Sequence, residues 1–513
     1  MKLVTAAQMR DLEEAAFASG TTQAQLMETA GRSVAVAVRE HLGGARARRI
    51  VVLVGPGNNG GDGMIAARHL YDFGADILVF LLTPRPDGDP LVENLRSRGL
   101  EVITLSGDEP DGGLLEALDR ADAVLDAVLG IGARRPLDGL IAATFEHLKR
   151  RRSRLFALDL PTGLDADSGA IDPHAASADV TLTLGFSKIG LHLLPGSEHV
   201  GQVEVLDIGL ERYAGPEVQA ELMTASWARE RLPRRPAESN KGTFGRVLIV
   251  AGSVRYTGAA ALASLGALRA GAGLVTLATI PSVRAAVSPF LPEVTFLPLA
   301  EEDGAIAESS GDLIAHAVPG YSAIVIGPGL SLTSGTQAVA RGVLTAPALE
   351  STPVVVDADA LNALSRLPGW AAEIRTQAVL TPHPGELARL VSRDIPDVQE
   401  DRVETARACA ATWNQTVVLK GAHTIVAGAG GHVLVSPYAT AALATAGTGD
   451  VLAGAIAGLI AQGVAPFDAA GLGVYLHGAA AETFRDEYGH SGLLASELGM
   501  AIARVAHRLA LER

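Results

Sequence analysis

A glycine-rich loop near the end of the chain has the composition of a site for phosphoryl transfer. Its sequence is Ala444-Thr445-Ala446-Gly447-Thr448-Gly449-Asp450, and it leads into a helix of small and branched apolar residues at 451–460. Gly447 and Gly449 allow a sharp turn and leave bare N–H groups at the positive end of the helix, which attracts a phosphate or a developing anion. Asp450 beside this anion hole suits a general base that takes a proton from a hydroxyl. The alternative is that Asp450 only caps the helix.

A second glycine-rich loop lies near the start of the chain. We expect a buried strand at 49–54, the loop Gly-Pro-Gly-Asn-Asn-Gly-Gly-Asp-Gly at 55–63, and a helix at 64–71. A strand, a glycine loop and a helix in this order form an arrangement that cradles phosphates. The glycines also match the dinucleotide-binding fingerprint, but that fingerprint requires an acidic residue at the end of the next strand, and 77–83 has none there. An ordinary nicotinamide dehydrogenase is therefore disfavoured.

Polar side chains follow the ends of further strands in the first half of the chain. These strands are expected at 101–105, 123–129, 155–160, 180–184 and 203–208. Alternating strands and helices indicate a parallel sheet, and ligands of such sheets gather at the carboxyl ends of the strands. Asn59, Asp126 and Thr162 supply oxygen atoms from these ends, which suits a hard cation. Each of the three residues taken alone is more often a cap or a turn residue.

The alternation of strands and helices breaks and then resumes, which predicts two α/β domains. Turn and breaker residues at 211–216 and 232–236 interrupt the first series. The second series has expected strands at 246–250, 274–279, 323–326, 353–356, 378–380, 416–419 and 432–435. A length of 513 residues also favours two or more domains. We place the first domain at 1–212, a linker at 213–221 and the second domain at 222–513.

The second series again carries its polar and glycine-rich loops at strand ends. Gly327-Pro328-Gly329 follows one expected strand, and Asp357-Ala358-Asp359 follows the next. His383 stands between two prolines, which hold it rigidly, and a ligand contact is a better explanation there than a purely structural histidine. Lys420-Gly421-Ala422-His423-Thr424 places a cation where a nucleotide phosphate would lie, although a solvated turn lysine is the alternative.

Composition limits the classes of partner. The net charge is −15, which argues against nucleic acid or an anionic membrane as a partner. Cys409 is the single cysteine, so no intrachain disulfide forms and a reducing compartment is expected. The first residues lack the apolar segment of a secretory signal, and the apolar tract at 439–465 is interrupted by polar residues, so no membrane span is expected. We therefore expect a cytoplasmic protein.

These loops together resemble those of the bifunctional NAD(P)H-hydrate repair enzymes. The resemblance rests on 58–62, Asp159-Leu160-Pro161-Thr162-Gly163, Gly327-Pro328-Gly329, His383-Pro384-Gly385-Glu386, 420–424 and 447–450. It implies a Rossmann-like epimerase domain with a parallel sheet, followed by a ribokinase-like α/β dehydratase domain that uses ADP. Two residues depart from the family pattern: Thr162 replaces a frequent serine, and Ser331 stands where glycine is common. Serine would be strained at that position if the backbone requires a positive φ.

The resemblance also implies site residues and ligands. In the first domain, the residues implied to bind the hydrate are Asn58, Asn59, Gly60, Gly61, Asp62, Gly130, Ile131, Gly132, Ala133, Arg134, Arg135, Pro136 and Asp159. Potassium would be bound by Asn59, Asp126 and Thr162. In the second domain, the hydrate would be bound by Ala259, Gly329, His383 and Asp450, and the nucleotide, with Mg²⁺, by Lys420, Gly421, Ala422, His423, Thr424 and Gly449. The implied small-molecule substrates are NADH hydrate, NADPH hydrate and ADP, and a homo-oligomer is expected.

The implied chemistry agrees with the residue types. Hydration of the nicotinamide ring gives a hydroxyl on a carbon beside nitrogen, in R and S epimers. Asp450 would take the proton of that hydroxyl as the glycine loop steadies the transferring phosphoryl group, and loss of phosphate would restore the double bond. Asp159 is the acid/base candidate for epimerisation.

Two other functions remain open on the sequence. One is an ordinary sugar or vitamin kinase fused to a nucleotide-binding domain, which would accumulate a phosphorylated product. The other is a nucleotide-sensing scaffold, which would bind its ligand without turnover.

Overall fold

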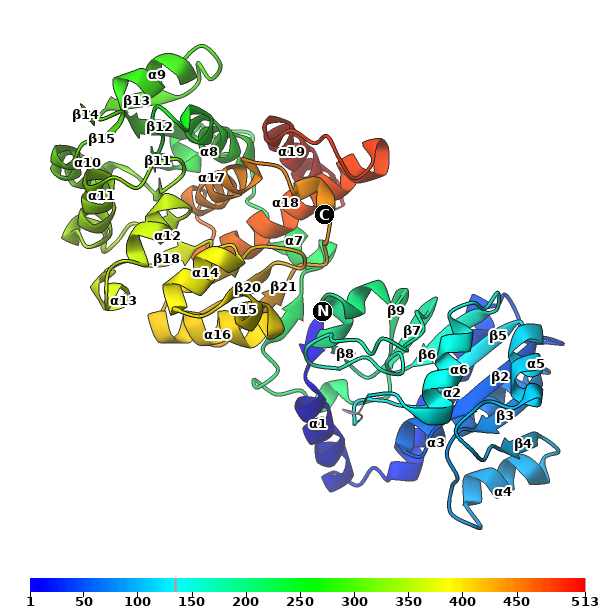
Figure 1. The fold of residues 1–513 in the computed structure, drawn as a ribbon. Coiled ribbons are helices and arrows are strands. Elements are labelled where there is room, and N and C mark those ends of the chain that lie inside the picture. Colours follow the sequence, from blue (N-terminus) through cyan, green and yellow to red (C-terminus); the bar gives the residue numbers. More distant parts are fainter. Residues whose placement is uncertain (133–135, 513) are drawn as a thin grey trace. The chain divides into compact units, whose positions relative to one another are not determined.

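The computed structural model describes residues 1–132 and 136–512, and the chain divides into two compact units (Figure 1). The first unit is Lys2–Ala220 and the second is Glu221–Arg513. Each unit is built of strands that alternate with helices, which confirms the predicted α/β class with its two series. No helix in the described part of the chain has the length and apolar character needed to cross a membrane.

The first unit contains a parallel sheet with helices on both faces. Its strands are β1 (Lys2–Val4), β2 (Arg49–Val54), β3 (Asp76–Leu81), β4 (Glu101–Thr104), β5 (Ala123–Ala127), β6 (Arg154–Leu158), β7 (Val180–Leu184), β8 (Ser187–Lys188) and β9 (Gln202–Leu206). Its helices are α1 (Ala6–Ala18), α2 (Gln23–His41), α3 (Asn58–Asp72), α4 (Pro90–Ser97), α5 (Gly112–Arg120) and α6 (Gly139–Leu148). The order across the sheet is β4-β3-β2-β5-β6-β7-β9, and all these pairs are parallel.

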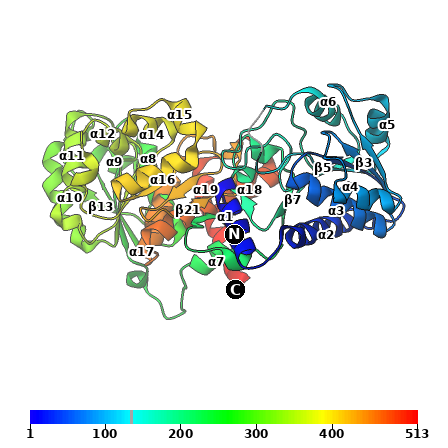
Figure 2. The ribbon, with the colours of Figure 1, turned by 90° about the horizontal axis from the view of Figure 1, so that it is seen from below.

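The two faces of this sheet explain why its strands are apolar throughout. In β2, Ile50, Val52 and Val54 belong to the core that includes α2 and α3. Val51 and Leu53, which point to the opposite face, belong to the core that includes α5 and α6 (Figure 2). Successive side chains of a strand alternate between faces, so a strand covered on both sides is apolar at every position.

The second unit is built around a larger sheet. Its strands include β10 (Ala220–Leu222), β11 (Arg246–Val250), β12 (Leu274–Thr279), β13 (Thr295–Pro298), β14 (Glu301–Glu302), β15 (Ala305–Ile306), β16 (Ala323–Ile326), β17 (Val354–Val356), β18 (Ala378–Leu380), β19 (Thr416–Leu419), β20 (Ile425–Ala427) and β21 (Val433–Val435). Its helices include α7 (Ala225–Arg231), α8 (Thr257–Ala270), α9 (Pro281–Val287), α10 (Gly311–Ala317), α11 (Ser334–Leu344), α12 (Asp359–Leu364), α13 (Trp370–Glu373), α14 (Pro384–Val391), α15 (Ile395–Glu400), α16 (Arg402–Trp413), α17 (Thr448–Ala461), α18 (Pro466–Tyr488) and α19 (Ala495–Leu511).

The order in this sheet runs β13-β12-β11-β16-β17-β18-β19-β20-β21. The pairs from β13 to β19 are parallel, and β19-β20 and β20-β21 are antiparallel hairpin pairs. The sequence pattern predicted strands near β19 and β21 but missed β20 between them.

Close backbone contact between α8 and α17 accounts for the small residues of the predicted helix at 451–460. A Cβ at Gly454 would lie 1.9 Å from the Ala263 carbonyl oxygen, and one at Gly266 would lie 2.2 Å from that of Val451. Only glycine permits this approach, because any side chain would separate the two helices. The predicted helix at 451–460 is therefore present, and its apolar composition agrees with its buried position.

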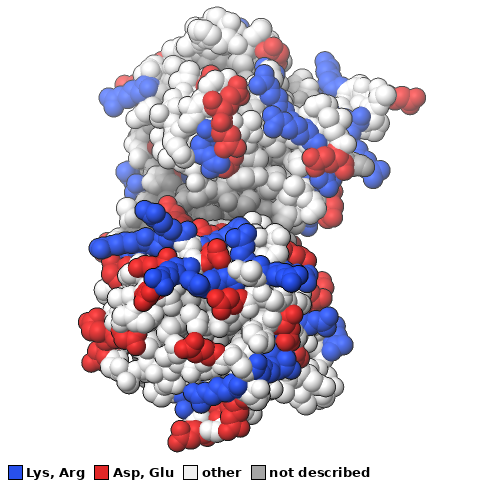
Figure 3. Space-filling view, turned by 90° about the vertical axis from the view of Figure 1, so that its right-hand side faces the viewer, with Lys and Arg blue, Asp and Glu red and all other residues white. Residues whose placement is uncertain are grey.

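Charged side chains pair locally on the surface. On the face in Figure 3, Lys and Arg side chains are interspersed with Asp and Glu. In the first unit, Arg48 pairs with Asp122 and Arg49 with Asp76. Exposed pairs of this kind contribute at most about 1 kcal/mol each.

We propose that the domain boundary lies at 213–221, and a cut in this segment is expected to yield two soluble pieces. Each side has its own sheet and core, so each should unfold cooperatively on heating. A matched cut at Asp303, in the exposed turn between β14 and β15, separates β11 and β12 from β16 and should give insoluble pieces. Soluble pieces from the Asp303 cut, or an insoluble piece from the cut at 213–221, would contradict this boundary.

Candidate active sites

The first unit has a cavity of about 460 Å³ where the strand order reverses at β2, between β3 and β5. Such a reversal is where open α/β sheets bind their ligands. The predicted binding residues that line this cavity are Asn58, Asn59, Asp62, Gly130, Ile131, Gly132 and Asp159. Gly60, Gly61 and Pro136 are not among the residues that line it. Ala133, Arg134 and Arg135 lie outside the described residues.

The glycine loop after β2 is shorter than predicted, because α3 already begins at Asn58 rather than at Met64. Gly55 passes so close to the next strand end that a Cβ there would lie 1.9 Å from the Val128 carbonyl oxygen. Gly60 is helical and serves the same close packing, since its Cβ would lie 2.3 Å from the carbonyl oxygen of Gly55. No side chain of the described residues caps the start of α3, so its first N–H groups point to an anion site in the cavity.

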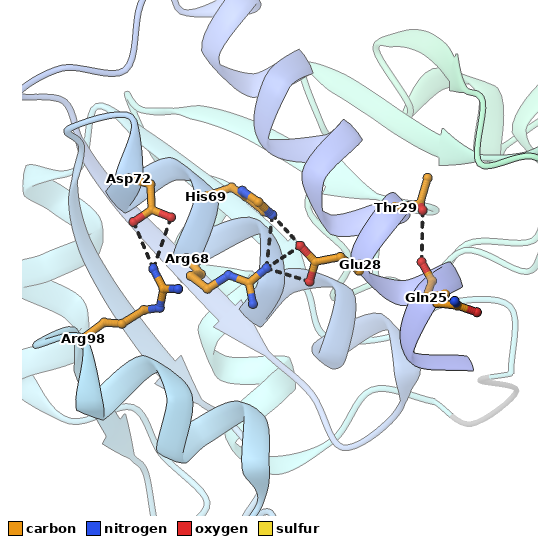
Figure 4. A network of polar contacts seen from close by, with 7 residues as sticks. All are labelled: Gln25, Glu28, Thr29, Arg68, His69, Asp72 and Arg98. Atoms are coloured by element: carbon orange, nitrogen blue, oxygen red, sulfur yellow. Dashed lines mark hydrogen bonds and ion pairs between the residues drawn. The ribbon is translucent and has the colours of Figure 1, made fainter. Parts of the chain in front are cut away.

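A network of polar contacts ties α3 to α2 and so fixes the helix that carries Asp62 (Figure 4). Arg68 Nη2 donates to Glu28 Oε1 at 2.5 Å and to Oε2 at 2.6 Å, and His69 Nε2 lies 2.8 Å from Glu28 Oε1. At the end of α3, Asp72 pairs with Arg98 at 3.2 Å. Burial opposes the charged form of Glu28, but hydrogen bonds from Arg68 and His69 outweigh it and lower the pKa of Glu28.

Asp159 is held in place by a fully buried lysine. It follows β6 with φ 69°, a backbone conformation that non-glycine residues seldom adopt and that favours a functional role. Lys188 has no exposed surface, and its Nζ donates to Asp159 Oδ1, to Thr183 Oγ1 at 3.1 Å and to the Leu184 carbonyl oxygen at 3.0 Å. The Leu184 N–H also donates to Asp159 Oδ1 at 3.0 Å. The carboxylate thus has a fixed direction and a permanent counter-charge.

Two further carboxyl groups lie beside this ion pair in the same cavity. Asp62 is 8% exposed, and burial together with Asp159 and Glu13 raises its pKa well above the usual range. Burial and Asp159 also raise the pKa of Glu13, against the smaller effect of Lys188 and Arg10. The cavity therefore contains carboxyl groups that favour different protonation states.

Asp126 and Thr162 meet as the sequence pattern predicted. The Thr162 N–H donates to Asp126 Oδ2 at 2.8 Å, and the Thr162 hydroxyl donates to Oδ1 at 2.7 Å. The carboxyl is 1% exposed and accepts no hydrogen bond from a cationic side chain of the described residues, so burial raises the pKa of Asp126 to about 6. Asn59 lies near the same loop, because a Cβ at Gly130 would lie 3.4 Å from Asn59 Oδ1. Asn59 Nδ2 is buried and has no hydrogen-bond partner in the part of the chain that the structure describes.

In the second unit, the predicted residues converge at the carboxyl ends of parallel strands. Gly329 follows β16, His383 follows β18, and Lys420 follows β19. These strands belong to one parallel run, so their carboxyl ends meet at one edge of the sheet. The N-terminus of α17 brings Gly449 to this edge, since a Cβ at Gly449 would lie 3.5 Å from Lys420 Nζ.

Asp450 is not the N-cap of its helix. The N-cap of α17 is Gly447, with φ 89°, and Asp450 lies in the first turn. Its half-buried carboxyl has no hydrogen bond from any described residue. Burial raises the pKa of Asp450 to about 7, with Asp357 raising it further and Lys420 lowering it. A carboxyl with this pKa is well suited to general base catalysis near neutral pH.

Lys420 is surrounded by carboxylates. Its Nζ donates to Asp357 Oδ1 at 2.7 Å and lies 3.8 Å from Glu386 Oε2. Burial opposes the charged form, but Asp357 and Glu386 outweigh it and raise the pKa of Lys420. Burial raises the pKa of Glu386 to about 7. The lysine is therefore a permanent cation beside Asp450.

His383 caps helix α14 and holds one tautomer. Its Nδ1 accepts from the Gly385 N–H at 3.0 Å and the Glu386 N–H at 3.3 Å, so any proton sits on Nε2. Burial, Lys420 and Arg389 lower the pKa of His383, which keeps the ring neutral. A neutral Nε2–H can donate a hydrogen bond to a ligand.

The first turn of α8, which contains Ala259, adjoins the loop that contains Gly329. A Cβ at Gly329 would lie 2.9 Å from the Ala259 Cβ, and Gly329 has φ 62°. Ser331 has φ 67°, so the expected strain at this serine is present. It is offset by two hydrogen bonds: the Ser331 N–H donates to Asp359 Oδ2 at 2.8 Å, and its hydroxyl lies 2.9 Å from that of Ser253.

The segment Lys420–Thr424 joins β19 to β20, and its residues differ in what they contact. His423 Nδ1 lies 3.0 Å from the Ser436 carbonyl oxygen, and the Thr424 hydroxyl donates to the Gly421 carbonyl oxygen at 2.8 Å. Arg402 Nη2 donates at 3.2 Å to the carbonyl oxygens of both Leu419 and Lys420. These contacts hold the backbone that presents the Lys420 side chain.

Sequence reasoning did not place Glu13, Lys188, Asp357 or Glu386 among the site residues. Asp357 and Glu386 carried a usable signal, because both lie in loops at strand ends that the sequence pattern had already marked. Lys188 had a weaker signal, as the single Lys, Arg, Asp or Glu within the segment 180–193.

The fold and the two sites define a two-unit α/β protein, with a Rossmann-like first unit and a ribokinase-like second unit. Residues 23–190 match the family model described as YjeF-related protein N-terminus, and residues 247–504 match the model described as NAD(P)H-hydrate dehydratase. The bifunctional NAD(P)H-hydrate repair enzyme of Moorella thermoacetica is 39% identical over 507 residues, which cover 97% of this chain and 95% of that relative. The enzyme of the same description from Salinibacter ruber is 37% identical over 502 residues, covering 94% and 91%. This chain belongs to the family of bifunctional NAD(P)H-hydrate repair enzymes.

Solved structures match the second unit. A ribokinase-like superfamily protein from Enterococcus faecalis is 25% identical, with a TM-score of 0.50, and the match covers 57% of this chain and 97% of that protein. The ADP/ATP-dependent NAD(P)H-hydrate dehydratase of Bacillus subtilis, co-crystallized with ATP/Mg²⁺, is 38% identical, with a TM-score of 0.48, covering 56% and 97%.

Proposed function

We propose that this protein repairs hydrated NADH and NADPH. The first unit interconverts the R and S epimers of the hydrate, and the second unit dehydrates the S epimer at the expense of ADP, giving NAD(P)H, AMP and phosphate. Beside the family membership, the observation that carries this proposal is the position of Asp450. It lies in the first turn of α17, after the Gly447 and Gly449 turn, with a pKa of about 7 and a buried lysine nearby.

These groups account for each step of dehydration in turn. Asp450 takes the proton of the hydrate hydroxyl as the oxygen attacks the terminal phosphoryl group of the nucleotide. The N–H groups at the start of α17 and the Lys420 ammonium face the charge that develops on that group. The bond between carbon and oxygen then breaks, phosphate departs, and a proton lost from the neighbouring carbon leaves the ring double bond. The His383 Nε2–H is a donor that can orient the hydrate.

Mg²⁺ bound to the nucleotide would neutralise part of the negative charge of its phosphates. The carboxyl groups of Asp357, Glu386 and Asp450 gather around Lys420, and oxygen donors of this kind suit a nucleotide-borne Mg²⁺.

Potassium is proposed for the first unit, with Asn59, Asp126 and Thr162 as its ligands. The oxygen donors fit a hard cation, and the buried carboxyl of Asp126 has no cationic side-chain partner among the described residues, so a metal ion would supply the missing positive charge. A homo-oligomer and a cytoplasmic location stay predictions.

We expect Asp126→Asn to weaken the potassium dependence of epimerisation, because it removes the only formal negative charge of the proposed ligand set. The rate is measured as potassium chloride replaces choline chloride at constant ionic strength. Asp119→Asn, which removes an exposed carboxylate from α5, is the matched control. Dehydration of S hydrate by Asp126→Asn should be unaffected, because it takes place in the second unit. An unchanged potassium dependence of epimerisation in Asp126→Asn would rule out this ion site.

Incubation of the protein with mixed hydrate epimers and ADP tests the whole proposal. The expected result is the return of reduced-nicotinamide absorbance together with free phosphate. A phosphorylated product that accumulates would instead support the kinase alternative, and binding without turnover would support the scaffold alternative.

A further inference from the structure

The cavity of the first unit holds more acid groups than one acid/base residue requires. Glu13, Asp62 and Asp159 all line it, and they come from α1, from α3 and from the end of β6. Among the described residues, Lys188 is the one fully buried cation beside them, and it donates to Asp159. Arg10, on the rim, is exposed and screened by solvent.

The charges of this cluster determine where a proton resides. A buried carboxylate without a paired cation is costly, so it takes up a proton instead. Lys188 is committed to Asp159 through a direct hydrogen bond. Asp62 is buried, has no cationic partner among its described neighbours, and lies near the negative charges of Asp159 and Glu13. The cluster thus presents one ionised and one protonated carboxyl to the same cavity.

We infer that Asp62 is a second catalytic residue of the epimerase, acting as the general acid, and that Lys188 is the positioning residue that keeps Asp159 as the general base. The inference rests on the proposed epimerase function. Asp62 lies where this role requires it, in the second turn of a helix whose start opens onto the cavity.

The reaction is balanced as follows. Asp62 gives its proton to the hydroxyl oxygen of the hydrate, the bond between carbon and oxygen breaks, and the lone pair of the ring nitrogen forms a carbon–nitrogen double bond. Water leaves, and the ring carbon is planar and cationic. A water molecule adds to the opposite face, the electrons of the double bond return to nitrogen, and Asp159 accepts the proton of that water. Return of this proton from Asp159 to Asp62 through water or Glu13 restores the starting state.

Epimerisation is measured on the full-length protein without nucleotide, from one pure epimer, by chromatography, with the spontaneous rate subtracted. Asp62→Asn is isosteric and should lower the rate by about 10²–10⁴-fold while hydrate binding is retained. Asp119→Asn removes an exposed carboxylate from α5, away from the cavity, and should leave the rate unchanged. Wild-type protein that fails to interconvert the epimers would contradict the proposed function itself. Interconversion by wild type and Asp62→Asn at equal rates would contradict only the role of Asp62.

The wild-type pH profile provides a test that needs no variant. The wild-type rate should fall at high pH, as Asp62 loses the proton that it donates. Lys188→Met removes the counter-charge of Asp159 and should lower the rate, whereas Lys188→Arg keeps a cation there and should retain more of it, a difference that a purely structural lysine would not cause. A wild-type profile without a fall at high pH, or equal rates for Lys188→Met and Lys188→Arg, overturns the assignment.

The origin of the hydroxyl oxygen in the product shows whether the carbon–oxygen bond of the hydrate breaks. In water enriched in oxygen-18, product of the inverted configuration should carry the heavy isotope, beyond the exchange seen without protein. Inverted product that keeps its original oxygen would overturn cleavage of the carbon–oxygen bond.

Discussion

Asp450→Asn is expected to lower dehydration of the S hydrate by about 10²–10⁴-fold, because it removes a positioned general base. The amide keeps the size of the carboxyl, and Asp450 makes no hydrogen bond with a described residue that the change would break, so hydrate and nucleotide binding should be retained. Turnover is followed by the return of reduced-nicotinamide absorbance, and binding by calorimetry. Asp468→Asn, a first-turn acid of the neighbouring helix α18, is the matched control. Turnover of Asp450→Asn near the wild-type rate would remove Asp450 from the mechanism.

The same residue predicts a pH dependence. A general base acts in its ionised form, and the pKa of Asp450 is about 7. The wild-type rate of dehydration should therefore rise as pH increases through about 7. The residual rate of Asp450→Asn should lack this rise, because an amide does not titrate in that range. The same rise in both proteins would assign the titration to another group, with Glu386 the first candidate.

Asp159→Asn is expected to leave R hydrate behind while S hydrate is consumed at a near-normal rate. The second unit should accept only the S hydrate, because a pocket that aligns one hydroxyl with Asp450 and the phosphoryl donor places the hydroxyl of the other epimer out of line. Intact protein with ADP should consume both epimers. Chromatography that separates the R and S epimers measures the consumption of each directly. Slow spontaneous epimerisation will still convert some R hydrate in the variant.

This variant needs controls, because it leaves the buried Lys188 without its carboxylate partner. Breaking a buried pair in this way costs about 3–5 kcal/mol. The double variant Asp159→Asn/Lys188→Met removes both charges and should restore stability without restoring epimerisation. Asp179→Asn, which removes an exposed carboxylate of the same unit, should behave as wild type. If a stable Asp159 variant clears R hydrate as fast as the intact protein, either Asp159 is not the acid/base or the second unit is not stereospecific.

Much of this fold follows from local sequence. The strands at 49–54, 180–184, 246–250, 274–279, 323–326, 378–380 and 416–419 lie where the sequence pattern predicted them. Runs of branched apolar residues between turn signals are a local property, and a strand buried on both faces needs little else to be recognised. The glycine loops at Gly55 and Gly447 were visible for the same reason, because positive φ and close backbone contact each leave glycine at a definite place.

Helix starts were harder to predict. Asn58–Gly63 is poor in helix formers, yet it forms the first turns of α3. Its glycines bring the helix against the neighbouring strand ends, as at Gly63, whose Cβ would lie 2.3 Å from the Ala127 Cβ. Packing against a strand distant in sequence outweighs the weak local preference, and no pattern within the segment contains that information.

The sequence by itself determined the two α/β series, the glycine-rich turns and the polar residues at strand ends, because each depends on neighbours along the chain. Only the tertiary structure decided which of those residues share a proton or a charge. Lys188 reaches Asp159 across 29 residues, and Lys420 reaches Asp357 across 63. Asp357 and Lys420 meet because β17 and β19 belong to one parallel run whose carboxyl ends share an edge, and Lys188 meets Asp159 because it follows β7, the neighbour of β6. Burial there makes each charge depend on its partner. The protonation states of Asp62 and Asp450 arise from that enclosure, which exists only once the sheet has formed.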